Sequence, residues 1–269
     1  MKHVDLHLHT THSDGSYSPT QIVKEAALLG METIAITDHD ITEGYEEALE
    51  ESKKWGVKLL TGVEITTHNY HILGYNFDIN HEEFQKTLRY SRECQENIVK
   101  QRIEVLNKQG IPITFEKIKN LFPKSRLGKL NIAMAIVLDE ECRQHTNTTY
   151  IEQIFMDCLR NNPKMKGIDK SKQLSVKQAI GIIHKAGGLA VIAHPFKDIK
   201  DPEKELKYLK ELGLDGIEVQ PNYNEKNDFY KKYARENGLI TTYGSDFHGS
   251  IFLHRPLLAR EENKILPFW

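Results

Sequence analysis

The sequence has little of what marks a membrane protein, a disulfide-bonded protein or a strongly charged one. No run of about 18 apolar residues is present, so we expect no membrane-spanning helix, and the start of the chain lacks the apolar stretch of a signal peptide. The 36 basic and 38 acidic residues nearly cancel, which argues against a surface that coats DNA. The three cysteines are few, odd in number and far apart, which predicts free thiols in a reducing cytoplasm: Cys94, Cys142 and Cys158.

The local signatures of several large enzyme classes are also absent. We find no Gly-x-Ser-x-Gly nucleophile elbow, no phosphate-binding P-loop and no glycine run of the dinucleotide-binding type. No internal repeat or low-complexity tract stands out. A side-chain nucleophile of the serine-hydrolase kind is therefore not expected.

Alternating strand and helix patterns at both ends of the chain predict an α/β domain. Hydrophobic residues make up 39% of the 269 residues, enough for a substantial core. Apolar periodicity predicts strands over 2–9, 32–37, 57–66, 69–77, 189–194, 215–219 and 239–246. It predicts helices between them over 20–30, 43–55, 175–186, 203–212 and 224–237. This alternation favours a parallel, barrel-like sheet with helices outside it.

The middle of the chain has a different pattern. Residues 80–174 show mainly helical periodicity, and the apolar positions from Phe84 to Leu106 predict one long amphipathic helix that ends before Gly110 and Pro112. Further helices are expected over 115–121, 129–141 and 149–161. We therefore predict a barrel domain formed by 1–79 and 175–269, and a helical insertion, or cap, formed by 80–174.

Side chains that bind metals recur at the ends of the predicted strands. His7 and His9 stand two apart in a strand, so their imidazoles point to the same face and can grip one divalent ion. Other histidines and carboxylates follow the later strands, and in barrels of alternating strand and helix that edge carries the active site. They are Asp38, His39, Asp40, Glu64, His71, His194, Asp246 and His248.

The motifs that hold these residues resemble the PHP family, which is named for polymerase and histidinol phosphatase. The matching segments are DLHLHTTHSDG (5–15), ITDHD (36–40), GVEI (62–65) with HILGY (71–75), AHP (193–195) and GSDFHG (244–249). The resemblance implies a distorted barrel of seven strand–helix units with two or three metals at its carboxyl-end face. The helical insertion narrows it to a branch of small phosphoesterases that act on nucleoside 3′,5′-bisphosphates and on 5′-phosphorylated short RNA.

Carried over residue by residue, the resemblance implies three metal positions. The first would be held by His7, His9, Glu64 and Asp246. Glu64 would bridge to a second position completed by His71 and His194. The third would be held by Asp14, His39 and His248. A metal-bound hydroxide would lie at Glu64, His194 and Asp246.

One segment of the insertion departs from the family pattern. Relatives carry a Gly-Arg-Pro-His-like segment whose basic groups reach the substrate phosphate, whereas Lys129 replaces the arginine here and Asn131 the histidine. Lys129 supplies positive charge without a two-pronged clamp, and Asn131 cannot protonate a leaving group. We expect both to contact substrate. Other basic residues of the insertion are either solvated or line a nucleotide groove: Arg102, Arg126, Lys164 and Lys166.

The charge of such a site favours phosphate esters. Three dications bring +6, and Asp14, Glu64, Asp246 and a hydroxide return about −4, so a net of about +2 would attract a doubly anionic phosphate. Imidazole and carboxylate ligands without thiolate suit manganese, iron or zinc. We hypothesise two or three such ions, with manganese as the activating metal in the cell.

Several alternatives remain open at this point. The leading prediction is a phosphoesterase, possibly an exonuclease, that acts on nucleotides or short nucleic acid with no membrane and no obligate protein partner. A histidinol-phosphatase-like enzyme and a non-catalytic, metal-bound nucleotide-binding module are the competitors. His68 competes with His71 as a ligand. Four acids either orient ligands or are solvated: Asp5, Asp38, Asp40 and Glu218.

Overall fold

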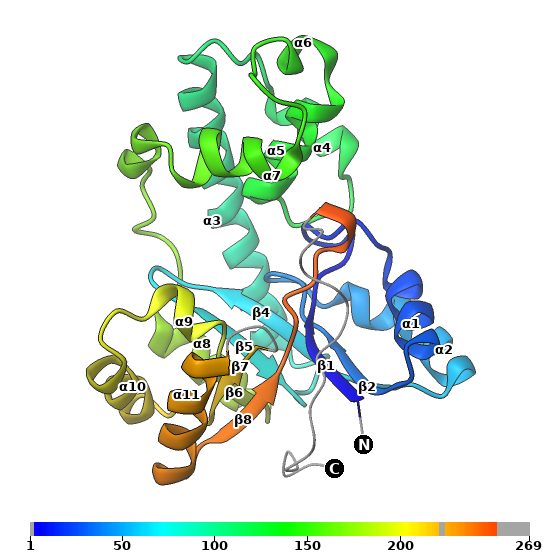
Figure 1. The fold of residues 1–269 in the computed structure, drawn as a ribbon, viewed down its shortest axis with the longest axis vertical. Helices are drawn as coiled ribbons and strands as arrows, with labels where there is room; N and C mark the ends of the chain where they lie inside the picture. The colour runs from blue at the N-terminus through cyan, green and yellow to red at the C-terminus, as the bar shows by residue number, and fades with distance from the viewer. Residues whose placement is uncertain (1–2, 221–223, 252–269) are drawn as a thin grey trace.

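The computed structural model describes residues 3–220 and 224–251, so the last part of the predicted barrel domain lies outside the described residues. The strands form two sheets (Figure 1). The first holds β1 (His3–Leu8), β2 (Met31–Ile36) and β3 (Lys58–Leu60), all parallel. The second holds five strands, in which each pairs with the next: β4 (Gly62–Thr66), β5 (His71–Tyr75), β6 (Leu189–Ile192), β7 (Gly216–Val219) and β8 (Ile240–Tyr243).

Two isolated bridges join the two sheets. Leu8, at the end of β1, forms an isolated parallel bridge with Phe247, which follows β8. His39, which follows β2, bridges in the same way to Glu64 of β4. The predicted α/β class is confirmed. The described residues form eight strands in two sheets, and the seven-stranded barrel stays a prediction.

The strand predicted over 57–66 is in fact two strands that belong to different sheets. β3 ends at Leu60, which pairs with Ala35 of β2, and β4 begins at Gly62, which pairs with Tyr75 of β5. A Cβ at Gly62 would lie 2.6 Å from the carbonyl oxygen of Ile36, so only glycine fits where the chain passes β2. Thr61 and Gly62 interrupt the apolar residues at this point, but a glycine inside a strand pattern marks a bulge as readily as a change of sheet.

The prediction of a parallel sheet is wrong for β5, which runs antiparallel to both β4 and β6. Only residues 67–70 connect β4 to β5. A parallel connection needs a crossover of about a dozen residues, so this short loop can only form an antiparallel pair.

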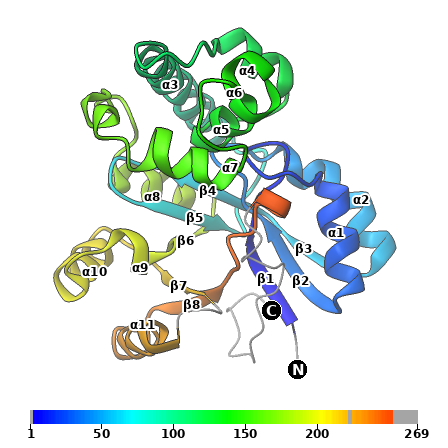
Figure 2. The same cartoon turned by 45° about the horizontal axis from the view of Figure 1, so that its top comes forward.

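Helices cover the outside of the strands (Figure 2). Ser18 and Ser175 begin α1 and α8 with capping boxes, in which the serine oxygen accepts from the backbone N–H of a glutamine three residues later. The helices of this region are α1 (Pro19–Leu28), α2 (Glu43–Trp55), α8 (Val176–Lys185), α9 (Pro195–Asp198), α10 (Pro202–Glu211) and α11 (Asn224–Glu236). Their buried faces pack on the sheets, as Ile22 and Val23 of α1 do with Ile34 of β2.

The segment between β5 and α8 is helical, and we call residues 80–174 the insertion. It holds α3 (Glu82–Asn107), α4 (Phe115–Leu121), α5 (Lys129–Leu138), α6 (Glu140–Arg143), α7 (Ile151–Ile154), the π-helix η1 (Phe155–Arg160) and the 3₁₀-helix η2 (Pro163–Gly167). The helix predicted over 129–141 breaks at Asp139, whose side chain accepts from the Cys142 N–H and begins α6.

The insertion has a hydrophobic core of its own. Val99 and Leu106 of α3 belong to one buried cluster with Ile132 and Ile136 of α5 and Leu159 of η1. Figure 1 shows α3 running from the sheets to the far end of this helical group. The domain boundaries at 79/80 and 174/175 remain a prediction.

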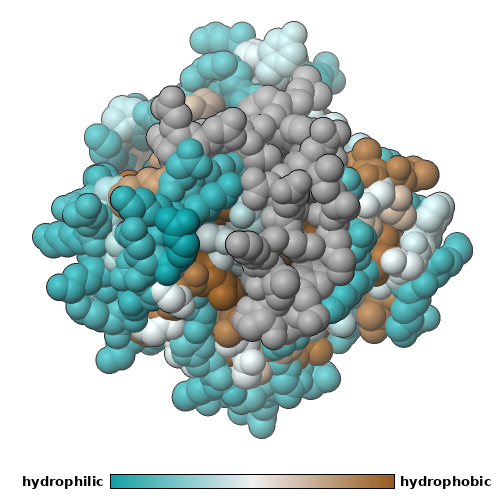
Figure 3. Space-filling view, turned by 60° about the horizontal axis from the view of Figure 1, so that its bottom comes forward, coloured by the Kyte–Doolittle hydropathy of each residue, from teal (hydrophilic) through white to brown (hydrophobic). Residues whose placement is uncertain are grey.

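One face of the molecule exposes mainly polar residues. Figure 3 shows hydrophilic residues over most of the uncovered surface on one face, with smaller apolar patches between them. Among the helices that the structure describes, none is both long enough and apolar enough to cross a membrane.

Candidate metal centre

The nine predicted metal ligands come together at one edge of the two sheets. Most follow the carboxyl end of a parallel strand, as His39 follows β2 and His194 follows β6. His71 stands instead at the amino end of β5, and the antiparallel direction of β5 brings that end to the same edge. The side chains that meet there are His7, His9, Asp14, His39, Glu64, His71, His194, Asp246 and His248.

The first group surrounds one oxygen of Glu64. The Nε2 atoms of His7 and His9 lie 3.1 Å apart, and each lies 3.2 Å from Glu64 Oε2. Asp246 Oδ1 lies 3.5 Å from His7 Nε2 and 3.4 Å from His9 Nε2. Four potential ligand atoms therefore surround one small volume, as the spacing of His7 and His9 predicts.

The other oxygen of Glu64 faces a second pair of imidazoles. Oε1 lies 2.8 Å from His71 Nδ1 and 3.0 Å from His194 Nε2. A carboxylate with histidines around both of its oxygens has the geometry of a bridge between two ions. His68, the competitor of His71, places its Nδ1 3.3 Å from the carbonyl oxygen of Leu174.

A third group forms around Asp14. Its Oδ1 lies 3.5 Å from His248 Nε2, and its Oδ2 lies 3.9 Å from His39 Nε2. His39 also reaches the first group, because its Nδ1 lies 3.2 Å from Glu64 Oε2. The imidazole of His9 stacks on that of His248 with ring centroids 4.1 Å apart, so the three groups form one continuous cluster.

The cluster has the polar atoms that a bound cation would satisfy. Asp14 Oδ1, His39 Nδ1 and Glu64 Oε2 are buried and have no hydrogen-bond partner in the described structure. Leaving such atoms unpaired is costly, so an unpaired set on facing side chains indicates a missing ligand. Imidazole nitrogens and carboxylate oxygens suit divalent transition metals, and the donor set therefore fits ions of this kind.

The electrostatics of the cluster favour the ligand forms of its carboxylates. Burial raises the pKa of Glu64, but the imidazoles of His39, His7 and His71 outweigh burial and hold that pKa well below its usual value. Burial likewise opposes the charge of Asp14, but His248 and His39 lower its pKa to about 2. Both carboxylates are thus ionised at neutral pH.

The histidines differ in their protonation. Burial holds the pKa of His39 well below 6.5, which leaves a neutral imidazole with a lone pair for a metal. Burial also lowers the pKa of His9, but the close carboxylates of Asp246 and Glu64 outweigh burial and raise the pKa to about 9. Without a metal His9 therefore carries a proton, which an incoming cation would displace.

Buried acids hold several of these histidines in place. Glu218 Oε1 lies 2.6 Å from His7 Nδ1, and Glu218 Oε2 accepts from the backbone N–H of His194 at 2.5 Å. Asp38 accepts from the Thr10 N–H at 2.7 Å. The four acids left open by the sequence are all buried, which excludes solvated positions for them: Asp5, Asp38, Asp40 and Glu218.

The backbone is strained at three of these positions. Asp40, His194 and Asp246 have φ values of 52°, 29° and 56°. Positive φ is uncommon for residues other than glycine and costs on the order of 1–3 kcal/mol, and it often occurs at functional sites.

Two charged residues beside the cluster were missed by the sequence analysis. Lys197 Nζ lies 2.5 Å from Asp246 Oδ2, and Asp198 Oδ2 lies 3.0 Å from His194 Nδ1. They occupy the third and fourth positions after His194 on the short helix α9, which turns them back toward it. A helix beginning at the His194–Pro195 turn was the signal for both residues, since proline is frequent at the first helical position.

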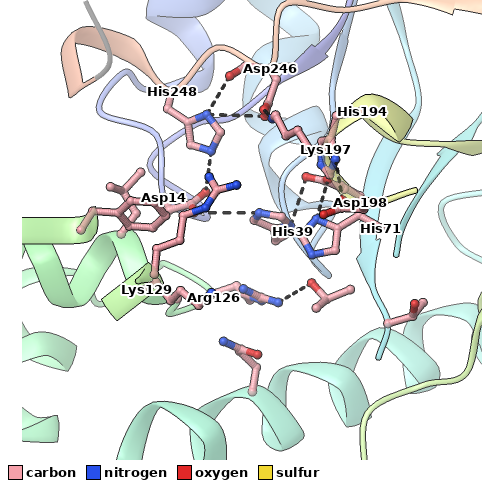
Figure 4. A pocket seen from close by; sticks show the side chains of 18 of the residues that line it. Asp14, His39, His71, Arg126, Lys129, His194, Lys197, Asp198, Asp246 and His248 are labelled. Atoms are coloured by element: carbon pink, nitrogen blue, oxygen red, sulfur yellow. Dashed lines mark hydrogen bonds and ion pairs between the residues drawn. The ribbon is translucent and has the colours of Figure 1, made fainter. Parts of the chain in front are cut away.

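A cavity of about 530 Å³ opens in front of the cluster (Figure 4). The cluster forms one wall, and the insertion forms the other with Lys129, Arg126 and Phe155 among its residues. Asn131 does not line the cavity. It is fully buried, and its amide donates to the Ser13 carbonyl and accepts from the Gly128 N–H, so we assign it no substrate contact.

Residues 5–263 match the family model of the PHP domain. The chain belongs to the PHP domain family. Among its relatives, a 5′-3′ exoribonuclease of Haemophilus influenzae is 32% identical over 92% of this chain and 90% of its own length. A 3′,5′-nucleoside bisphosphate phosphatase of Chromobacterium violaceum is 28% identical over 92% of this chain and 88% of its own length.

The solved structures agree with this assignment. A Bifidobacterium adolescentis protein described as a metal-dependent phosphoesterase has a TM-score of 0.79 at 28% identity, over 95% of this chain and 91% of that one. As a PHP domain protein with these relatives, the chain is a metal-dependent hydrolase that acts on phosphate esters.

Proposed function

We propose that this PHP domain protein hydrolyses terminal phosphate esters of nucleotides or short 5′-phosphorylated oligonucleotides. The observation that carries the proposal is the pairing of two features in one cavity. A cluster with unsatisfied ligand atoms forms one wall, and a basic and partly aromatic surface of the insertion forms the other. A cavity of about 530 Å³ is within the usual range for small-molecule sites.

The cluster would hold two or three divalent ions, which lower the pKa of the water they bind and neutralise the charge of a phosphate. His7, His9, Glu64 and Asp246 would hold the first ion, and Glu64, His71 and His194 the second. Asp14, His39 and His248 would hold a third. Among manganese, iron and zinc, we propose manganese as the activating metal.

The protein's own residues would orient the metal ligands and exclude bulk water from the site. Glu218 fixes the His7 ring through Nδ1 and leaves Nε2 facing Glu64, and Asp198 does the same for His194 through its Nδ1. Lys197 brings a positive charge next to Asp246, where it can meet a phosphate oxygen. Burial of the ligands keeps bulk water away from these charges, so their interactions are strong.

The insertion wall favours a nucleotide over a simple phosphate ester. The π-helix η1 brings Phe155 and Met156 to the cavity beside Leu130, and π-helical turns are frequent at functional sites. A nucleobase can stack on an aromatic ring and pack against such apolar groups. Lys129 contributes a positive charge on the same wall.

The test is phosphate release with manganese from four substrates. They are adenosine 3′,5′-bisphosphate, a 5′-phosphorylated oligonucleotide, histidinol phosphate and an aryl phosphate. The two nucleotide substrates should react fastest, and His194→Ala and Asp246→Ala should abolish release, whereas the exposed Glu104→Gln should not. Faster turnover of histidinol phosphate than of both nucleotides would refute the proposal.

A further inference from the structure

Two buried arginines line the cavity, and only one of them has a partner. Arg126 donates from Nε and Nη2 to Asp40 Oδ2 at 2.9 and 2.6 Å, and also donates to Thr66. Arg102 is 5% exposed, yet it has no hydrogen bond or ion pair with any residue in the described ranges, and its Nη1 is buried and unsatisfied. An unpaired buried guanidinium is unfavourable unless something else supplies the negative charge.

The surroundings of Arg102 add positive charge. Lys129, Arg160 and Lys170 line the same cavity, and Glu152 is the carboxylate that the insertion contributes to its lining. Asp198 of α9 also acts on Lys129. Burial first, and then the charges of Arg102 and Lys170, lower the pKa of Lys129 to about 8. Burial and the charge of Arg126 lower the pKa of Arg102 to about 9. These cations therefore act on one another across a short range.

The positions of these residues separate them from the metal cluster. Arg102 projects from α3, with Gln95 two turns earlier on the same face and also lining the cavity. Lys170 and Gln173 belong to the segment that returns from the insertion to α8, and Gln173 Oε1 is also buried without a partner. None of these four side chains belongs to the nine candidate ligands.

We propose that Arg102, Lys129 and Lys170 form an anion subsite for a second phosphate, one that is bound but not hydrolysed. The inference rests on the proposed function, because the first phosphate is the one at the metal cluster. Arginine suits this role, since its planar group gives two parallel hydrogen bonds to a phosphate. The subsite would select substrates with two phosphate groups over nucleoside monophosphates.

The first test measures thermal unfolding of the protein in chelator, with sulfate as the probe at constant ionic strength. Sulfate should raise the melting temperature of the wild type. Arg102→Met should melt at the same or a higher temperature without sulfate, because an uncompensated charge is removed, and should lose the response to sulfate. Arg89→Met, an exposed change on the same helix, should leave both properties unchanged. An equal sulfate response in Arg102→Met and wild type would overturn the proposal.

The second test measures kcat/KM with manganese for adenosine 3′,5′-bisphosphate and for the two adenosine monophosphates. Arg102→Met should lose about 10- to 100-fold on the bisphosphate and less than about twofold on the monophosphates. Arg102→Lys, which keeps the charge, should show a smaller loss. An equal loss on all three substrates would overturn the subsite. If the wild type hydrolysed no nucleotide at all, the proposed function would fail, while the sulfate result would still decide whether the anion site exists.

Discussion

The two walls of the cavity are built on opposite electrostatic principles. On the sheet wall, carboxylates and imidazoles face each other at 2.8–3.9 Å, and acids such as Glu218 hold the rings from behind. On the insertion wall, Arg102 and its neighbouring lysines have no comparable set of carboxylates. Among the described residues, the insertion contributes one carboxylate to the cavity lining, Glu152, and five cations: Arg102, Arg126, Lys129, Arg160 and Lys170. We infer from this difference that the sheet wall is suited to hydrolysis and the insertion wall to substrate selection.

The largest effect is expected at Glu64, which we propose links two ions on the sheet wall. Glu64→Gln removes the negative charge between two sets of histidines and should lower kcat by on the order of 1000-fold, with loss of bound metal. Phosphate release and elemental analysis of the purified variant check this, and circular dichroism verifies the fold. Full activity in Glu64→Gln would remove the basis of the site.

The protonation of the sheet wall gives a pH dependence with a definite sign. The pKa of His9 rises from 6.5 to about 9 on folding, so its contribution to the free energy of unfolding is complete below pH 6.5 and is lost as pH rises toward 9. In chelator, the melting temperature should fall over this range, by the equivalent of roughly 2–3 kcal/mol. The gain in melting temperature from added manganese should grow over the same range, because the ion competes with fewer protons. In His9→Gln the fall should be smaller by this amount but not absent, because burial lowers the pKa of His7 while Glu218 and Glu64 outweigh burial and raise that pKa well above 6.5. An unchanged fall would assign it to groups other than His9.

Glu218 contacts His7 of the sheet wall but does not line the cavity. A change at Glu218 therefore tests the positioning of the ligands apart from contact with the substrate. Glu218→Gln weakens the contact at His7 Nδ1 and should lower metal affinity by about 10- to 100-fold, measured by metal titration. Excess manganese should restore most of the activity. A loss of activity that excess metal did not rescue would point to a role other than ring positioning.

The smallest effect is expected on the insertion wall. Phe155→Ala should raise KM for nucleotides by about tenfold, the lower part of the range for losing one base-stacking contact. KM for an aryl phosphate should change less, and kcat should change little for either. Equal changes for both substrates would show that Phe155 supports the insertion rather than the base.

Much of this arrangement can be predicted from the sequence, because short motifs carry it. The alternation of two residues in His7-Leu8-His9 fixes the face of both rings, and strand ends predict where the other ligands meet. The direction of β5 was missed, although the four-residue loop before it excludes a parallel strand. The split at Thr61 is marked locally only by Gly62, and a glycine there indicates a bulge within one strand as readily as a change of sheet.

Long-range pairing is the part that the sequence cannot predict. Asp40 and Arg126 are 86 residues apart, and nothing in either segment indicates that they meet. The absence of a partner for Arg102 depends on every neighbour that the fold brings to it, so composition alone gives no hint of it. Metal binding by the nine converging side chains stays a prediction.

The left-handed backbone at Asp40, His194 and Asp246 has a consequence for protein engineering. Glycine adopts that conformation without steric penalty, so a glycine at His194 or Asp246 would relax the chain while deleting a candidate ligand. Laboratory evolution that selects for thermal stability alone would favour glycine at these positions, and the selected variants would be more stable but inactive. A screen of variants of this protein therefore has to select for activity and thermal stability in the same round.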